Sequence, residues 1–308
     1  MKVAVTGASG FLGRALVRKL LDASHSVTAI AHSREHAAEH PLLTWKWLDL
    51  GEPDISWSSL LAGAEVVYHL AWSTIPSEAN QAPANDARVN IVGSLRLIQA
   101  IRHDGAAPRV VFASSGGTVY GILSQIPATE DHPLRPISAY GVSKRAVEAY
   151  LEVIHGETGL SAVSLRMGNL YGPGQGLRRM FGAVTHFAHR ALAGEPIRIF
   201  GDGSVTRDYL YIDDAVDALM RAGAHTEHGN FNIGTGIGHS LNQVAAVIAA
   251  DLGRDIAIER LEARPFDVPV SILDASRAHA TFGWKARVAF EEGVVKTLRH
   301  IQAMDPDR

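Results

Sequence analysis

Tyr140 and Lys144 stand four residues apart in the segment ISAYGVSKRAVEAYL, where an apolar periodicity predicts a helix. Side chains four residues apart on a helix lie on one face, close together. A phenol beside an ammonium can act as an acid or base near neutral pH, because the positive charge lowers the phenol's pKa from about 10. The alternative is a surface pair without a chemical role, so other motifs must decide between the two.

A glycine-rich loop, TGASGFLG, occupies residues 6–13 between a short apolar run and a helical stripe of leucines. Its glycines Gly7, Gly10 and Gly13 are three residues apart. Glycines let the backbone approach a pyrophosphate closely, and the N-terminus of the following helix offers free N–H groups and the positive end of a dipole. Between a strand and a helix, this spacing predicts a dinucleotide site, with a plain tight turn as the alternative.

Strands alternate with helices through the first half of the chain. The apolar runs that predict further buried strands lie at 27–31, 65–70, 110–113 and 161–166. Helices around 89–102 and after residue 140 separate them, which predicts an α/β fold: a doubly wound parallel (Rossmann) sheet with a smaller C-terminal substrate lobe. We expect an NAD(P)-binding domain over 1–170, rejoined by about 205–235, and a mainly substrate-binding lobe over 171–308.

Composition narrows the class of protein. The chain has 308 residues, a net charge of −3 and no cysteine, so disulfides, thiolate metal sites and cysteine catalysis are excluded. Its basic residues are scattered, so we expect neither a nucleic-acid partner nor a membrane surface, and no apolar run approaches the roughly 20 residues of a membrane span. Because the first strand begins at Lys2, we expect no signal peptide and therefore a cytoplasmic enzyme. We also expect no metal site.

Further motifs follow in a fixed order. They are VVYHLAW (66–72), RVNIVGSL (88–95), FASSGGTVYG (112–121), LRMGNLYGPGQ (165–175), RDYLYIDD (207–214) and RPFDV (264–268). Together with the glycine loop and YGVSK (140–144), they make the chain resemble the extended short-chain dehydrogenase/reductase family. The resemblance is to the NAD-dependent nucleotide-sugar epimerase branch of that family, whose members include UDP-glucose 4-epimerases, and it extends over nearly the whole chain.

The resemblance implies roles for the reacting groups. Tyr140 would be the acid/base, while Lys144 would hold the nicotinamide ribose and lower the phenol's pKa. Ser115, with Ser114 as the alternative, would hydrogen-bond the sugar oxygen as it becomes a ketone. Family members that eliminate water have an Asp–Glu pair directly after this serine, whereas residues 116–118 here read Gly-Gly-Thr, which favours simple epimerisation or keto reduction.

The resemblance also implies cofactor contacts. The expected cofactor is NAD, and NADP is not excluded: the slot for a ribose-binding carboxylate is Ala31, and Arg34 nearby can accept a 2′-phosphate. The expected cofactor-binding residues are Gly7, Gly10, Phe11, Leu12, Gly13, Arg34, Asp49, Leu50, Leu70, Ala71, Asn90, Tyr140 and Lys144.

A nucleotide-diphosphate sugar is the expected substrate. The expected contacts are Ser115, Gly116, Asn169, Gln175, Arg207 and Arg264. The two arginines can clamp a diphosphate, since guanidinium suits phosphate oxygens. The alternative for each is a salt bridge, for Arg207 with Asp208 or Asp214 and for Arg264 with Asp267.

The sequence thus predicts a nucleotide-sugar 4-epimerase that oxidises and re-reduces C4 with a bound nicotinamide cofactor. A UDP-hexose such as UDP-glucose or UDP-galactose is the first expectation, and a dTDP-6-deoxyhexose such as dTDP-L-rhamnose the second. The alternatives are an NADPH-dependent 4-keto nucleotide-sugar reductase and a non-catalytic dinucleotide-sensing protein. The family also implies a homodimer that forms through the helices around 89–102 and 142–154.

Overall fold

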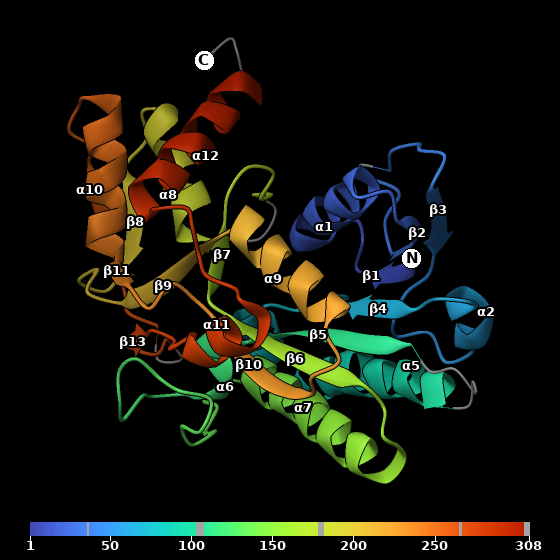
Figure 1. The fold of residues 1–308 in the computed structure, drawn as a ribbon. Helices are drawn as coiled ribbons and strands as arrows, with labels where there is room; N and C mark the ends of the chain where they lie inside the picture. The colour runs from blue at the N-terminus through green and yellow to red at the C-terminus, as the bar shows by residue number, and fades with distance from the viewer. Residues whose placement is uncertain (36, 103–107, 178–181, 265–266, 305–308) are drawn as a thin grey trace.

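A seven-stranded parallel sheet forms the centre of the computed structural model, which describes residues 1–35, 37–102, 108–177, 182–264 and 267–304 (Figure 1). In spatial order its strands are β10 (Gly229–Ile233), β6 (Ala162–Met167), β5 (Arg109–Ser115), β4 (Val66–His69), β1 (Lys2–Thr6), β2 (Ser26–Ala31) and β3 (Leu43–Trp47). Every neighbouring pair is parallel. The predicted doubly wound fold is confirmed.

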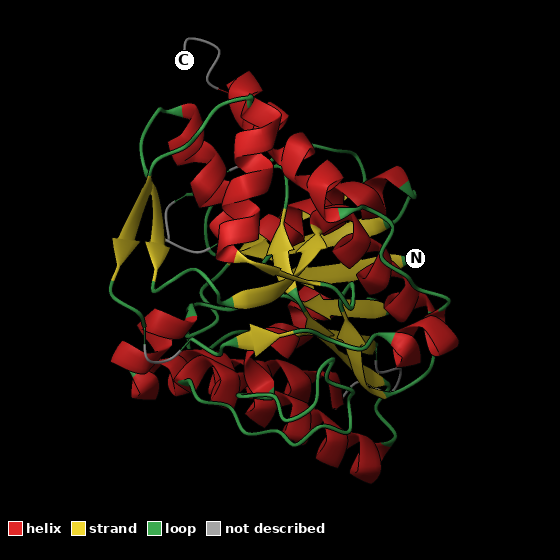
Figure 2. Ribbon diagram, turned by 90° about the vertical axis from the view of Figure 1, so that its left-hand side faces the viewer, coloured by secondary structure: helices red, strands yellow, loops and turns green. Residues whose placement is uncertain are grey.

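Helices cover both faces of this sheet, and in Figure 2 its strands lie between helical layers. The helices of one face are α1 (Phe11–Asp22), α9 (Ile212–Ala224) and α11 (Ser276–Phe282). Those of the other are α2 (Trp57–Leu61), α5 (Gly93–Arg102) and α7 (Ala139–Thr158). Successive strand residues point to opposite faces: Val3 and Val5 of β1 pack with the first set, and Ala4 packs with the second.

Short helices connect the strand ends on the α7 side. They are α3 (Pro76–Gln81), α4 (Pro83–Asp86), the π-helix η1 (Ala87–Val92) and α6 (Gly116–Val119). The η1 segment runs directly into α5, so that α4, η1 and α5 form one nearly continuous helical stretch. π-helical turns are rare and often lie at functional sites.

The smaller lobe has its own sheets and core. Its strands are β7 (Asn169–Tyr171), β8 (Ile197–Phe200), β9 (Thr206–Tyr211), β11 (Gly238–Ser240), β12 (Ile258–Leu261) and β13 (Val270–Ser271). Its helices are α8 (Ala183–Leu192), α10 (Leu241–Leu252) and α12 (Phe290–Met304). We propose that the cofactor-binding domain and the smaller lobe divide near residue 170. Because α9 and β10 pack on the large sheet, they belong to the cofactor-binding domain. None of the described helices is long and apolar enough to cross a membrane.

The glycine loop gives a direct test of close packing. A Cβ placed on Gly13 would lie 2.1 Å from the Gly7 carbonyl oxygen, whereas a Cβ on Gly156, in the last turn of α7, would meet nothing within 4 Å. We expect Gly13→Ala to lower the free energy of unfolding by about 1–3 kcal/mol. Gly156→Ala is the control and should raise it by about 0.5–1 kcal/mol. Urea unfolding measures both, and a Gly13→Ala protein as stable as the wild type would contradict this packing.

Candidate active site

The glycine loop lies against the end of β4. Gly7 has a φ of +71°, and a Cβ there would lie 2.7 Å from the backbone nitrogen of Ala71. Leu70 and Ala71 therefore pass directly beside the loop. Gly10 is the N-cap of α1 and caps it with no side chain, which leaves N–H groups of the first turn available to an anion. The loop and helix end form a cradle that fits a pyrophosphate.

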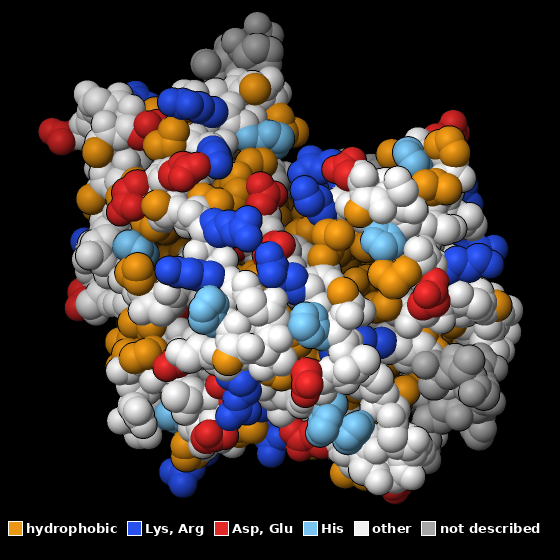
Figure 3. All heavy atoms as spheres, in the orientation of Figure 1, with side chains coloured by type: hydrophobic (Ala, Val, Ile, Leu, Met, Phe, Trp, Pro, Cys, Tyr) orange, Lys and Arg blue, Asp and Glu red, His pale blue; other side chains and the backbone are white. Residues whose placement is uncertain are grey.

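Arg14 connects this cradle to the smaller lobe. Its guanidinium donates from Nη1 to the Ser9 carbonyl oxygen at 2.9 Å and from Nη2 to the Gly174 carbonyl oxygen at 2.7 Å. The end of the LRMGNLYGPGQ motif is thereby held next to the glycine loop. Figure 3 shows this face of the molecule hollowed between the part that contains α12 and the part that contains α1, with basic side chains at the margin.

The adenosine side of the predicted site lies at the ends of β2 and β3. Asp49 accepts a hydrogen bond from the Gly51 N–H at 2.8 Å, and its other oxygen is 3.6 Å from His32 Nδ1. Arg34 is exposed, with its guanidinium 5.4 Å from the centre of the Trp47 ring. Asp49 also lines a cavity of about 710 Å³ between residues 49–53 and 73–89. Neither Tyr140 nor Lys144 lines this cavity.

Asn90 belongs to a buried polar network on η1. Its side-chain oxygen accepts from the N–H and hydroxyl of Ser73, and its amide nitrogen donates to Thr74 Oγ1 and to Asp86 Oδ1. The amide is therefore satisfied within the protein. A contact between Asn90 and the cofactor stays a prediction.

Tyr140 and Lys144 lie in the first two turns of α7, which Ser138 caps by accepting from the Gly141 N–H. Lys144 Nζ donates to the Ala113 carbonyl oxygen of β5 at 2.7 Å. It also lies 3.6 Å from the centre of the Trp72 ring and 5.7 Å from that of Tyr140. The Trp72 ring meets the Tyr140 ring edge-on at 5.9 Å. The two predicted residues and Trp72 thus form one cluster at the end of β5.

The electrostatics of the pair differ from the prediction. Burial raises the pKa of Tyr140, and the nearby Asp86 carboxylate raises it further. Burial lowers the pKa of Lys144 to about 7, although Glu148 and Asp86 oppose that shift. The prediction of a lowered phenol pKa is therefore wrong for the protein by itself. The ammonium points to Ala113 and Trp72, and the desolvation of the phenolate outweighs its attraction.

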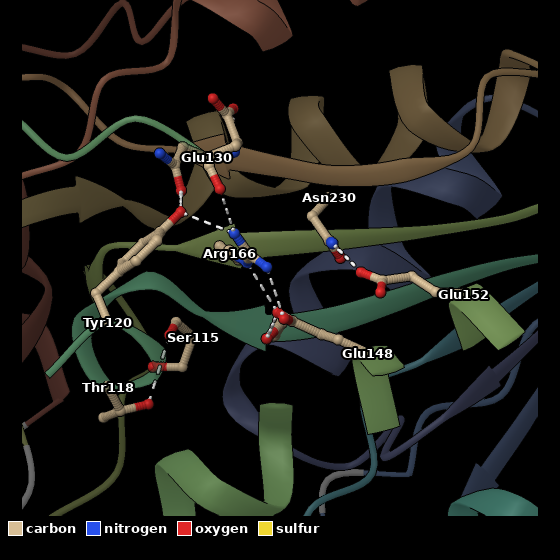
Figure 4. A network of polar contacts seen from close by, with 10 residues as sticks. Ser115, Thr118, Tyr120, Glu130, Glu148, Glu152, Arg166 and Asn230 are labelled. Atoms are coloured by element: carbon tan, nitrogen blue, oxygen red, sulfur yellow. Dashed lines mark hydrogen bonds and ion pairs between the residues drawn. The ribbon is translucent and has the colours of Figure 1, made fainter. Parts of the chain in front are cut away.

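The structure separates the two candidate serines. Ser114 is buried, and its hydroxyl donates to Glu148 Oε1 at 2.5 Å. Glu148 in turn pairs with Arg166 at 2.8 Å in the polar network of Figure 4. Ser115 is half-buried at the carboxyl end of β5, where it serves as the N-cap residue of α6. Ser114 already has a structural partner, which supports Ser115 as the reacting serine.

A ring of polar side chains surrounds Gly117. A Cβ on Gly117 would lie 3.3 Å from Asn169 Oδ1, 3.9 Å from Ser271 Oγ and 4.0 Å from Ser115 Oγ. A Cβ on Gly116 would instead lie 2.5 Å from the Leu273 side chain, so this position cannot hold a larger residue without a shift. Ser115 and Asn169 were expected here. Ser271 was not, and only its pairing from β13 brings it to the site.

The predicted phosphate clamp is held by one carboxylate. Arg264 Nη2 lies 2.8 Å from Asp267, as the salt-bridge alternative proposed, and its guanidinium lies 4.3 Å from the centre of the Phe200 ring. Arg207 donates to the carbonyl oxygens of Thr206 and Val268, and its ion pair is also with Asp267, at 4.0 Å. Of the RPFDV motif, residues 265 and 266 lie outside the described residues.

The expected alternative pairs for Arg207 are wrong, because both carboxylates have other partners. Asp208 accepts from the N–H groups of Thr235, Gly236 and Leu273. Asp214 accepts from the N–H of Val288.

Gln175 also has partners within the protein. Its amide nitrogen donates to the Leu170 carbonyl oxygen at 3.1 Å, and its oxygen accepts from the Thr185 hydroxyl at 2.5 Å. The two bonds connect the segment that follows β7 to β7 itself and to α8. A contact between Gln175 and substrate stays a prediction.

Comparison with known proteins identifies the family. Residues 3–234 match the model of the NAD-dependent epimerase/dehydratase family. The chain belongs to this family. The predicted resemblance and the prediction of an NAD-dependent enzyme of the extended short-chain dehydrogenase/reductase type are confirmed.

Similar members of the epimerase/dehydratase family match over the full length. The UDP-glucose 4-epimerase of Mycolicibacterium smegmatis is 37% identical, and the alignment covers 97% of each chain. The crystal structure of UDP-glucose 4-epimerase from Thermotoga maritima with UDP-glucose is 33% identical, with a TM-score of 0.93 and 99% of each chain covered. The Thermus thermophilus UDP-glucose 4-epimerase complex with NAD is also 33% identical, with a TM-score of 0.91 over 98% of this chain and 99% of that one.

Burial of the Lys144 ammonium predicts a pH-dependent effect on stability. The group's pKa is about 7 in the folded chain and 10.5 in an exposed lysine, so charge burial destabilises the protein fully below pH 7, and the penalty disappears as the pH rises to 10.5. Lys144→Met should therefore raise the melting temperature more at pH 6 than at pH 9.

The matched control is Lys296→Met, since Lys296 lies on the surface at 2.6 Å from Glu292. Its effect should be the same at both pH values. Equal effects of Lys144→Met at pH 6 and pH 9 would show that the ammonium is not desolvated.

Proposed function

We propose that the protein is a nucleotide-sugar 4-epimerase with a UDP-hexose as substrate. The observation that supports it most is the position of the acid/base pair. Lys144 bonds to the Ala113 carbonyl of β5, the strand that ends two residues later at Ser115. The Tyr140–Lys144 pair therefore lies beside the strand whose carboxyl end carries Ser115, and ligands bind at the carboxyl ends of strands in open α/β sheets. Similarity to a UDP-glucose 4-epimerase solved with UDP-glucose supports the choice of a uridine nucleotide.

In the proposed mechanism, the chain's own residues accept and return the proton of the C4 hydroxyl and orient the sugar. Tyr140 as phenolate takes the proton of the C4 hydroxyl, and Ser115 hydrogen-bonds the same oxygen as it becomes a ketone. Burial and the Asp86 charge raise the pKa of Tyr140 in the protein alone, so the phenolate needs positive charge beside it, which a protonated Lys144 would supply. NAD, when bound, supplies the hydride acceptor and, in its oxidised form, a second positive charge. The ketone turns in the site, and Tyr140 then returns the proton to O4 of the opposite epimer.

The residues after Ser115 support epimerisation over dehydration. Elimination of water needs an acid and a base beside C5 and C6, but positions 116–118 have no carboxylate. Gly116 is packed against Leu273, and Thr118 donates to the Ser115 carbonyl oxygen at 3.4 Å. This corner can hold a sugar hydroxyl but cannot transfer a proton to or from carbon.

The smaller lobe supplies the grip on the nucleotide. Arg207 and Arg264 both pair with Asp267, so one carboxylate faces two guanidinium groups. The remaining positive charge is available to a bound diphosphate. The Phe200 ring beside Arg264 offers a flat apolar face to a base. Asn169, beside Ser115, would contact the sugar.

One observation favours a second function, an NADPH-dependent 4-keto nucleotide-sugar reductase. The end of β2 has Ala31 where a carboxylate would bind the 2′-hydroxyl of NAD. Arg34 lies three residues after the end of the strand and is exposed. A guanidinium there suits the 2′-phosphate of NADP. The family match supports either enzyme over a non-catalytic sensor.

Cofactor analysis and turnover separate the two enzymes. The purified protein is denatured and the released cofactor identified, and fresh protein is incubated with UDP-glucose and, separately, dTDP-L-rhamnose without added cofactor. Bound NAD and an equilibrating pair of C4 epimers are expected with UDP-glucose. A protein that stays inert until a 4-keto sugar and NADPH are supplied would be the reductase instead.

Removal of the Tyr140 hydroxyl tests the assigned acid/base. Tyr140→Phe should lower kcat by about 10²-fold or more, because proton transfer from C4-OH loses its acceptor. NAD content, measured after denaturation, should match the wild type, since the glycine cradle is untouched. A variant with near wild-type kcat would disprove the role of Tyr140.

We also propose a homodimer that forms through the outer face of α7. Val142, Tyr150 and Val153 are exposed on this helix, with 46–58% of each residue accessible, and Val92 is exposed on the neighbouring η1. Spacings of eight and eleven residues place the three α7 side chains on one face. Such a stripe across two adjacent helices fits the same stripe of a second copy.

Light scattering tests the dimer. The wild type should have twice the mass of one chain, and Val153→Asp should shift it to a single chain because a carboxylate would enter the apolar contact. Met304→Asp is the control: this residue is also exposed, at the far end of α12, and should leave the mass unchanged. A wild type that elutes as a single chain would contradict the proposal.

A further inference from the structure

Asp86 is a fully buried carboxylate at the junction of α4 and η1. It accepts hydrogen bonds from Thr74 Oγ1, from Asn90 Nδ2 at 2.8 Å and from Ser143 Oγ at 2.5 Å. All three donors are neutral, and no cation in the described part of the chain lies within ion-pair distance of it. Because a buried charge without a counter-ion is costly, its presence calls for a reason beyond stability.

The three donors come from the segments on either side of the acid/base pair. Ser143 directly precedes Lys144 on α7, and Thr74 follows two residues after Trp72, whose ring contacts Tyr140 and the Lys144 ammonium. Asn90 holds the same loop, since its oxygen accepts from Ser73. The Asp86 carboxylate thus joins α7 to the Trp72 loop.

The π-helical turn allows this arrangement. Asp86 and Asn90 are four residues apart across the start of η1 and bond to each other, so both side chains face α7 and the Trp72 loop together. The contact between Asp86 and Ser143 joins residues 57 apart in the sequence. One wide turn therefore presents an anion and an amide to the same corner of the site.

Asp86 also differs in charge balance from the other groups that face Lys144. Glu148, on α7, pairs with Arg166 at 2.8 Å, and both side chains are at most 2% exposed. His69, on β4, bonds to the hydroxyls of Thr6 and Ser94, and burial followed by the Lys144 charge lowers its pKa to about 3. Tyr140 faces Asp86 as well. Asp86 is the carboxylate of this group that lacks a guanidinium partner within the described residues.

We propose that Asp86 is a positioning residue of the acid/base pair: it fixes the start of α7 against the Trp72 loop, and its charge keeps the proton on Lys144 in a dry site. The charge effect concerns the protein alone, and only the effect on turnover rests on the proposed function. A charged Lys144 is needed to support the Tyr140 phenolate, so Asp86 acts on Tyr140 through Lys144. Its direct repulsion of the phenolate is the cost of that arrangement.

The charge is tested by NMR titration of lysines that carry ¹³C at the ε-carbon, with the Lys144 signal identified by its absence in Lys144→Met. The wild-type signal should titrate near pH 7. In Asp86→Asn, which keeps the shape of the side chain, the midpoint should fall by about one pH unit or more. An unchanged midpoint would overturn the proposal. Because no substrate is present, this result is independent of the proposed function.

Positioning is tested by Ser143→Ala, which keeps the buried charge and removes only its bond to α7. The Lys144 midpoint should stay at its wild-type value, while kcat with UDP-glucose should fall about 10- to 100-fold because the pair is misplaced. A wild-type kcat in Ser143→Ala would overturn the positioning role. This measurement tests that role even if Asp86→Asn does not fold. If the wild type itself does not turn over any nucleotide sugar, the proposed function fails while the titration still tests Asp86.

Discussion

The desolvated ammonium of Lys144 is the constraint on which the rest of the site depends. A buried lysine remains charged only where carbonyl, aromatic and anionic groups replace water. Here the Ala113 carbonyl, the Trp72 face and two carboxylates take that part. These groups come from β5, the loop after β4, α4 and α7, so β4, β5 and both helices must be in place before Lys144 has this environment.

Local sequence patterns were sufficient for elements with a strong internal signal. The strands predicted at 27–31 and 110–113 match β2 and β5, and the helix after Tyr140 is capped by Gly159 in the left-handed region. No prediction was made for β3 or α12. β3 is an edge strand of half-exposed residues, and its pairing with β2 supplies what the local pattern lacks.

The site was predictable where chemistry follows from a motif and not where it follows from tertiary contact. Tyr140, Lys144 and the glycine loop could be found from their spacing. Asp86, Trp72 and Ser271 could not, because the contacts that bring them to the site span long stretches of chain. The direction of the Tyr140 pKa was predicted wrongly for the same reason: burial is a property of the folded chain, and here it raises the phenol's pKa, with the Asp86 charge adding to the rise.

The central claim is that Tyr140, Lys144 and Ser115 support the transient oxidation and re-reduction of C4 of a UDP-hexose. The most direct measurement follows UDP-glucose that carries deuterium at C4, incubated with the protein and no added cofactor. We predict UDP-galactose that retains deuterium at C4, since the hydride that leaves the carbon returns to it on the other face. Product with protium at C4, or product that forms only when NADPH is supplied, would contradict the account.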